Sequence, residues 1–231
     1  MSHDGSGAAL GAARTGGLRG AAAVIFERLG MANIITVARL PLLIAIVLLF
    51  YSPSPVVRLI SVVLLVVLIG MDTLDGLIAR ARNEVSLMGS VLDIMADRAV
   101  ELVLWVVYAD LGLVPVAIPI IFVLRGTIVD SLRSVHVSAG TAPFKGMRTG
   151  IGKWLVGSPF MRSAYGISKL ISFAGLALTH ALAAYAALGT VSDAIVGQSL
   201  TLFLITSWIS VAFCLARGLP VIVEAMSSAA H

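Results

Sequence analysis

Charged residues are scarce in this chain of 231 residues. Asp, Glu, Lys and Arg make up 12% of it, compared with about a quarter of an average soluble domain. Hydrophobic residues account for 59%, and the mean hydropathy is +1.03. Several apolar runs are long enough for the roughly 20 helical residues that cross a bilayer and too long for barrel strands of about 10. The composition therefore excludes a soluble globular domain and predicts an all-α, polytopic membrane protein.

Cysteine is almost absent as well. The single cysteine, Cys214, lies in an apolar run, which excludes an intramolecular disulfide framework and predicts a buried packing residue. The net charge of +4 is not gathered into a basic run with interleaved aromatic residues. This pattern argues against a nucleic-acid partner.

Alternation of apolar runs with polar or proline-containing turns predicts six transmembrane helices, at about 33–51, 56–80, 90–110, 116–137, 164–188 and 194–216. Arg217, Gly218 and Pro220 are expected to end the last one. We assign residues 33–220 to one six-helix transmembrane domain and 221–231 to a cytoplasmic tail. Residues 138–163 are expected to form a loop with a short amphipathic segment.

The N-terminal part lacks the composition of a core. Residues 1–20 are rich in Gly, Ala and Ser and predict a flexible cytoplasmic N-terminus rather than a cleaved signal peptide. Residues 21–32 predict a short interfacial helix, with an extension of the first span as the alternative. Of the 16 Lys and Arg residues, only Arg58 falls at the opposite end of the spans. The positive-inside bias therefore places both termini and the loops at 81–89 and 138–163 in the cytoplasm, with the protein in the cell (inner) membrane.

Four aspartates interrupt the apolar pattern. On the predicted helices, Asp72 and Asp75 share one face at i, i+3, and Asp93 and Asp97 share another at i, i+4, so a short reversal would bring them together. A carboxylate facing lipid costs several kcal/mol unless it is paired, hydrated or bound to metal. Four hard oxygen ligands favour Mg²⁺, Mn²⁺ or Ca²⁺. They can hold two ions about 4 Å apart, as in phosphoryl transfer.

Neighbouring residues suit a phosphate ligand. Gly76 and Gly89 lack a Cβ where a nucleotide or its pyrophosphate would approach the backbone, and Arg80 has a fork of donors for phosphate. The structural alternative is a salt-bridge network of the aspartates with Arg80, Arg82 and Arg98. Membrane helices rarely carry such a cluster without a function.

These positions resemble a known signature. The string Asp72-x2-Asp75-Gly76-x2-Ala79-Arg80-x8-Gly89-x3-Asp93-x3-Asp97 is similar to the full motif of the CDP-alcohol phosphotransferases, with every interval matching. Asn33, Thr36 and Arg39 resemble the N-x2-T-x2-R motif of many members, although such residues are also ordinary at the end of a span. The specific resemblance covers about residues 33–101.

The resemblance implies that a phosphatidyl group passes from CDP-diacylglycerol to an alcohol with release of CMP, in phospholipid biosynthesis. It implies two divalent cations, Mg²⁺ or Mn²⁺. Asp97 would complete the coordination of the second ion and also act as the base for the acceptor hydroxyl. The implied metal ligands are Asp72, Asp75, Asp93 and Asp97. The implied CDP-binding residues are Asp72, Gly76, Ala79, Arg80 and Gly89. Members of the family commonly form homodimers, so we expect one here.

The residues that bind the acceptor alcohol are expected outside the aspartate motif. Arg125 and Arg133 lie two turns apart on one face of the fourth predicted span, too deep to be simple orientation signals. They predict a site for an anionic acceptor, and glycerol 3-phosphate is our first choice. Inositol phosphate or another alcohol stays open, because residues 140–148 do not reproduce the pattern expected of the glycerophosphate branch.

Two other classes of function were weighed. An ion-coupled transporter would use intramembrane aspartates as an ion path, but its site is expected near the midplane, between broken helices. A metal-dependent lipid phosphatase would not need Gly76 and Gly89 at these spacings and would turn over without an alcohol. His136 and His180 are expected to be hydrogen-bonding residues rather than catalysts.

Overall fold

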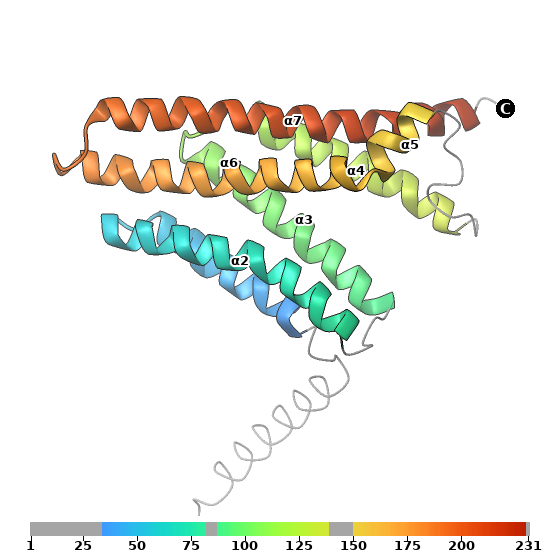
Figure 1. The fold of residues 1–231 in the computed structure, drawn as a ribbon, viewed down its shortest axis with the longest axis horizontal. Helices are drawn as coiled ribbons and strands as arrows, with labels where there is room; N and C mark the ends of the chain where they lie inside the picture. The colour runs from blue at the N-terminus through green and yellow to red at the C-terminus, as the bar shows by residue number, and fades with distance from the viewer. Residues whose placement is uncertain (1–33, 82–86, 139–149, 230–231) are drawn as a thin grey trace, which may run out of the picture.

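All elements in the described part of the chain are helical (Figure 1). The computed structural model describes residues 34–81, 87–138 and 150–229. Its helices are Ile34–Phe50, α2 (Pro55–Ala81), α3 (Leu87–Asp110), α4 (Ala117–Ser138), α5 (Gly150–Gly157), α6 (Pro159–Ala186) and α7 (Asp193–Ala229). The all-α prediction is confirmed for these residues. The predicted N-terminal segment and interfacial helix lie outside them.

In the described part of the chain, three helices contain segments long and apolar enough to cross a membrane: Pro55–Asp72, Pro159–Ala186 and Asp193–Val223. Ile34–Phe50 is apolar but shorter. α3 and α4 interrupt their apolar sequence with several charged residues. The structure therefore supports a membrane protein, while the topology of six spans remains a prediction.

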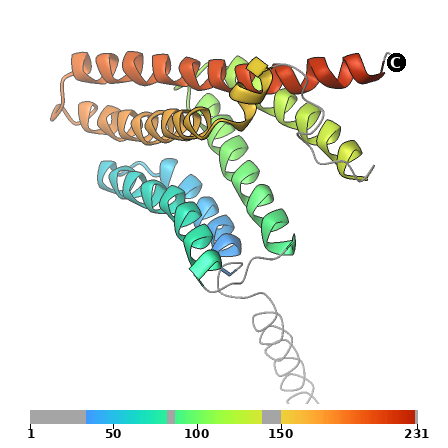
Figure 2. The same ribbon diagram turned by 45° about the vertical axis from the view of Figure 1, so that its right-hand side comes forward.

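The longest helices organise the arrangement (Figures 1 and 2). α6 and α7 run side by side in opposite directions, and α2 packs along α6. α3 runs obliquely away from the end of α2 toward α4, which packs against α7. The short α5 contacts the start of α6 and the C-terminal half of α7. α6 therefore connects α2 to α7 by packing against both.

Small and hydroxylated residues join α6 to α7. A Cβ at Gly175 would lie 2.1 Å from the ring of Phe203, so glycine is needed for this close approach. Ser210 donates to Ser168 at 3.1 Å, and Ser172 lies 3.3 Å from Ser210. In lipid, such close packing and interhelical hydrogen bonds hold helices together, because apolar contact alone offers no advantage over lipid tails.

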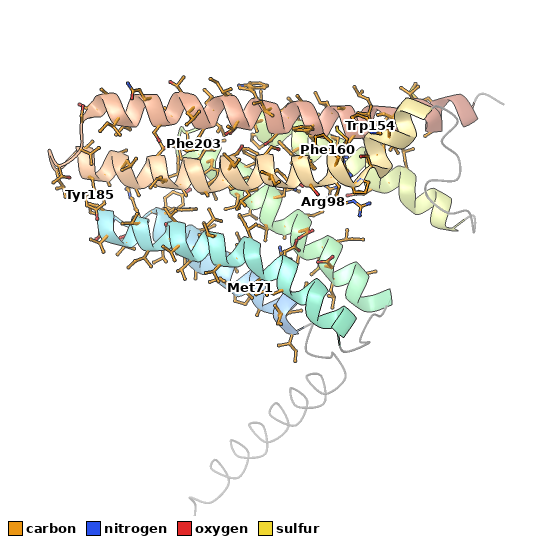
Figure 3. The ribbon with its side chains drawn as sticks, in the orientation of Figure 1. Met71, Arg98, Trp154, Phe160, Tyr185 and Phe203 are labelled. Atoms are coloured by element: carbon orange, nitrogen blue, oxygen red, sulfur yellow. The ribbon has the colours of Figure 1, made fainter. Side chains whose placement is uncertain are left out.

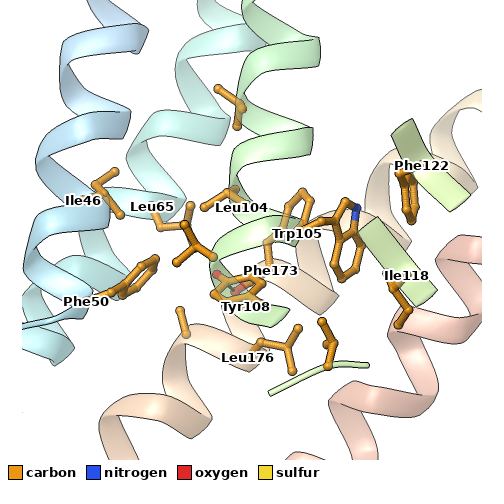
Figure 4. Close-up of a cluster of buried hydrophobic side chains, with 14 of the residues drawn as sticks. Ile46, Phe50, Leu65, Leu104, Trp105, Tyr108, Ile118, Phe122, Phe173 and Leu176 are labelled. Carbon is orange, nitrogen blue, oxygen red and sulfur yellow. Dashed lines mark hydrogen bonds between the residues drawn. The ribbon is translucent and has the colours of Figure 1, made fainter. Parts of the chain in front are cut away.

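The core lies where the helices cross (Figure 4). Trp105 of α3 stacks on Phe122 of α4 with ring centroids 5.0 Å apart and contacts Phe173 of α6 at 4.7 Å. Tyr108 is fully buried, and its hydroxyl donates to the Phe173 carbonyl at 2.7 Å. Aromatic pairs at these separations add to the stabilisation from buried area. The side chains of α3 thus fill the space between α4 and α6.

Two further predictions concern polar residues in the packed region. His180 is buried, and its Nε2 lies 2.9 Å from the carbonyl of Phe50, the last residue of its helix, which confirms a hydrogen-bonding role. His136 has its side chain outside the described set. Cys214 is buried, as expected.

The turns at the opposite end from the aspartates hold one more polar contact. The Tyr51 hydroxyl donates to the exposed carboxylate of Asp110. The contact links the end of the first helix to the end of α3.

Two predicted boundaries were wrong. α7 does not end at residues 217–220 but continues through Pro220 to Ala229. A proline removes one backbone donor, and membrane helices tolerate this where neighbouring groups compensate. α6 begins at Pro159 rather than near residue 164, because Ser158 caps it by accepting from the backbone N–H of Met161 and proline suits the first helical turn. The short helix α5 occupies the segment predicted to be amphipathic, and residues 139–149 lie outside the described residues.

Candidate metal and active site

Three of the four predicted aspartates converge. Asp72 comes from α2, and Asp93 and Asp97 come from successive turns of α3. One carboxylate oxygen from each lies within 4.8 Å of the other two. The prediction that two helix faces meet is confirmed for these residues. Asp75 lies in α2, but its side chain is outside the described part.

Arg39 of the first helix lies at the centre of this cluster. Its Nη1 donates to Oδ1 of Asp72 at 2.8 Å, and its Nη2 donates to Oδ1 of Asp97 at 3.0 Å. Nη1 is also 4.0 Å from Oδ1 of Asp93. The Arg39 side chain is 3% exposed, whereas the three aspartate side chains are 38 to 50% exposed. The guanidinium is therefore buried behind carboxylates that remain open to solvent.

The charge balance of the cluster leaves room for a cation. Three carboxylates face one guanidinium in this cluster. Arg39 uses one oxygen of Asp72 and one of Asp97. Accessible carboxylate oxygens with excess negative charge suit a hard divalent ion such as Mg²⁺ or Mn²⁺. These residues fit the predicted metal site.

The alternative of a structural salt-bridge network is not supported for Arg98. Its guanidinium reaches Asp130 of α4, with Nε to Oδ2 at 3.2 Å, and Glu101 of α3, with Nη1 to Oε2 at 3.0 Å. Arg98 points away from the aspartate cluster because it lies one residue beyond Asp97, about 100° around the helix. The side chains of Arg80 and Arg82 lie outside the described set.

The predicted nucleotide residues lie at the ends of α2 and α3 next to the cluster. Gly76, Ala79 and Arg80 belong to the last two turns of α2, and their side chains lie outside the described ones. Gly89 is the third residue of α3 and is half-buried. The backbone therefore places all four positions within about two turns of Asp72 or Asp93.

The predicted acceptor residues lie on α4. Arg125 is 8% exposed, and its Nε has no hydrogen-bond partner among the described residues. Gly218 of α7 faces it, and a Cβ there would lie 2.8 Å from both Cγ and Nε of Arg125. The missing side chain of Gly218 gives this arginine its space. The Arg133 side chain is outside the described part.

Sequence reasoning missed the position of two charged groups. Arg39 belongs to a recognised motif but was not assigned to the site. Glu101, one turn beyond Asp97, binds Tyr165 and Lys169 of α6 and was not singled out at all. The available signal was its spacing, since Asp93, Asp97 and Glu101 recur every four residues along one face of α3.

Comparison with known proteins gives two findings. Residues 29–214 match the family described as CDP-alcohol phosphatidyltransferase. A 66-residue stretch is 39% identical to the CDP-diacylglycerol--glycerol-3-phosphate 3-phosphatidyltransferase of Rickettsia bellii (strain RML369-C), covering 29% of this chain and 36% of that protein. The family match extends over most of the chain and includes the aspartate cluster, so the chain belongs to the CDP-alcohol phosphatidyltransferase family.

Proposed function

We propose that the protein is a metal-dependent phosphatidyltransferase of phospholipid biosynthesis, which transfers the phosphatidyl group of CDP-diacylglycerol to an alcohol and releases CMP. The observation that carries the proposal is the convergence of Asp72, Asp93 and Asp97 from two helices around a buried Arg39. Family membership supports the reaction class. The relative from Rickettsia bellii is named for a transfer from CDP-diacylglycerol to glycerol 3-phosphate.

In this proposal all four aspartates of the motif bind the metal ions. Asp72, Asp75 and Asp93 hold Mg²⁺ or Mn²⁺, and Asp97 completes the set. When bound, the two ions neutralise the pyrophosphate and stabilise the CMP leaving group. Arg39 holds Asp72 and Asp97 in place through one oxygen of each.

The acceptor hydroxyl supplies the nucleophile. Its oxygen forms a bond to the phosphorus that carries diacylglycerol, the bond from that phosphorus to the CMP oxygen breaks, and the hydroxyl proton passes to Asp97. The Asp97 side chain is half exposed, so it is accessible to a small alcohol from the aqueous side. Asp72, Gly76, Ala79, Arg80 and Gly89 line the CDP site, where the glycines let the pyrophosphate approach the backbone.

We propose glycerol 3-phosphate as the acceptor. A buried guanidinium such as Arg125, with a donor left unpaired among the described groups, suits a phosphate. Arg133, two turns along α4, is proposed to contribute as well. The name of the relative supports this choice, and inositol phosphate is the alternative.

The setting of the enzyme is also proposed. We propose six spans with the active site and both termini at the cytoplasmic face of the cell (inner) membrane, where the product CMP and a phosphorylated alcohol are soluble. Homodimer formation is expected from the family resemblance. Light scattering of the detergent-solubilised protein, with the detergent mass subtracted, measures it directly.

The test of the proposed function is CMP release by the purified protein. CDP-diacylglycerol is supplied with Mg²⁺ or Mn²⁺ and, in separate reactions, glycerol 3-phosphate, inositol phosphate, serine or no alcohol. We expect CMP and a new phospholipid only with an acceptor, and the highest rate with glycerol 3-phosphate. Release without an alcohol would indicate a hydrolase, and no release with any acceptor would refute the proposal.

A further inference from the structure

Glu101 occupies a buried position that the proposed reaction does not use. Its side chain is 5% exposed, and both carboxylate oxygens are bonded. Oε1 accepts from the Tyr165 hydroxyl at 2.9 Å and from Lys169 Nζ at 3.0 Å, both on α6. Oε2 accepts from Arg98 Nη1 at 3.0 Å. Arg98 is labelled in Figure 3, where α3 passes below α6.

A network of this kind is not needed merely to fill the core. Burying a carboxylate with two cations is costly, and apolar side chains of the same volume often stabilise a fold equally well or better. Charged hydrogen bonds do fix direction, because each donor must lie near 3 Å from its acceptor and along a lone pair. Such directional contacts favour one rotation of α3 about its axis.

The rotation of α3 matters because the aspartates share its face. Asp93, Asp97 and Glu101 lie at i, i+4 and i+8. A carboxylate lies roughly 6 Å from the helix axis, so a rotation of 20° would move it by about 2 Å. Binding sites need their groups within about 0.5 Å of the productive position. A modest rotation is thus enough to separate Asp93 and Asp97 from Asp72.

Both helices that carry the aspartates, α2 and α3, contact α6. α2, which carries Asp72, packs along α6. α3 meets α6 at two levels: through Trp105 and Tyr108, which contact Phe173, and, one turn nearer the aspartates, through Glu101, which binds Tyr165 and Lys169. On its other side, α3 is tied to α4 by Arg98, which meets both oxygens of Asp130 at 3.2 and 3.3 Å. The contacts with α6 and with α4 lie on different sides of α3 and so oppose its rotation about the helix axis.

We propose that Glu101 is a positioning residue for the metal site: by binding Tyr165 and Lys169 it sets the rotation of α3 that places Asp93 and Asp97 opposite Asp72. The proposal rests on the proposed function in one respect, that these aspartates hold a divalent cation. Glu101 itself touches neither the metal nor the substrate.

The experiment measures Mn²⁺ binding without substrate, by the loss of the free-ion electron paramagnetic resonance signal, on the full chain in detergent. Glu101→Gln keeps the shape of the side chain and removes the charge that organises the network. We expect its Kd for Mn²⁺ to rise about 10- to 100-fold, the range for losing a group that orients metal ligands.

Asp110→Asn is the matched control. It also removes a carboxylate of α3 that is bonded to a tyrosine, but 13 residues beyond Asp97 (positions 97 to 110), about 20 Å along the helix. Its Kd for Mn²⁺ should equal that of the unaltered protein. An equal loss in both variants would show a general weakening of α3 and would overturn the positioning role, as would an unchanged Kd in Glu101→Gln.

Tyr165→Phe keeps the test decisive if Glu101→Gln does not fold. This variant removes one donor and leaves Lys169 and Arg98 on the carboxylate, so we expect a rise in Kd of a few fold. An unchanged Kd in this variant, with Glu101→Gln unfolded, would assign the network to folding alone. Failure of the unaltered protein to bind Mn²⁺ at all would refute the proposed function instead, so the two failures are distinguishable.

Discussion

Arg39→Met offers a direct test of how the aspartate cluster is neutralised. The substitution keeps an unbranched apolar stem and removes the guanidinium that lies 2.8 Å from Asp72 and 3.0 Å from Asp97. Three carboxylates would then lie within 4.8 Å of one another without that cation. We expect the metal-free protein to become less stable and its response to metal to become larger.

The expected loss of stability in Arg39→Met depends on how exposed the three aspartate side chains are. At 4.8 Å and an effective dielectric constant of about 20, two like charges repel by about 3.5 kcal/mol. Breaking a buried ion pair costs about 3–5 kcal/mol, but the aspartate side chains are 38 to 50% exposed, so solvent screens roughly half of this. We expect a loss of about 1.5–2.5 kcal/mol, or about 3–10 °C in apparent Tm for a chain of this size.

The assay compares thermal unfolding of the purified protein in EDTA and in saturating Mg²⁺. Without Arg39 the three carboxylates lose the guanidinium that faces them, so the rise in Tm on adding Mg²⁺ should be larger in Arg39→Met than in the unaltered protein. Arg58→Met is the control, because Arg58 binds only the Ser52 carbonyl among the described residues, at 2.8 Å from its Nε. Its response to Mg²⁺ should not change. Equal responses in Arg39→Met and the unaltered protein would refute the role of Arg39 as the counter-charge.

Three other substitutions test the packing and the acceptor site. Gly175→Ala should lower stability by about 1–3 kcal/mol, because the new methyl overlaps Phe203, and Gly175→Ala with Phe203→Leu should recover part of the loss in thermal unfolding. His180→Ala should cost about 1–3 kcal/mol by leaving a buried carbonyl unpaired, and an unchanged Tm would contradict the hydrogen bond seen here. Gly218→Ala should displace Arg125 and raise the KM for glycerol 3-phosphate several fold while the KM for CDP-diacylglycerol stays constant; equal changes in both would argue against an acceptor site at Arg125.

The parts of the site that depend on local spacing could be predicted from the sequence. Asp93 and Asp97 are one turn apart on any helix, and a short reversal was enough to bring them to Asp72. The contact of Arg39 with these residues depends on how the first helix packs against α2 and α3. That packing is set by side chains far from the motif, so the sequence left the role of Arg39 open.

The charge pairing of α3 could not be predicted for a similar reason. Arg98 lies next to Asp97 in the chain, which suggested that they interact, yet the helix turns it toward Asp130 and Glu101. The other partners of Glu101, Tyr165 and Lys169 of α6, lie more than 60 positions further along the chain. The end of α7 was mispredicted because proline and glycine normally interrupt helices, whereas here the missing side chain of Gly218 accommodates Arg125.

The central claim is that the aspartate cluster holds the metal that supports phosphatidyl transfer. It is tested most directly by CMP release from CDP-diacylglycerol and glycerol 3-phosphate in the unaltered protein, Asp93→Ala and Asp110→Asn, each with and without Mg²⁺. We predict Mg²⁺-dependent release by the unaltered protein and Asp110→Asn, and a loss of at least 100-fold in Asp93→Ala with its folded state retained. Metal-dependent release by Asp93→Ala at the rate of the unaltered protein would contradict the claim.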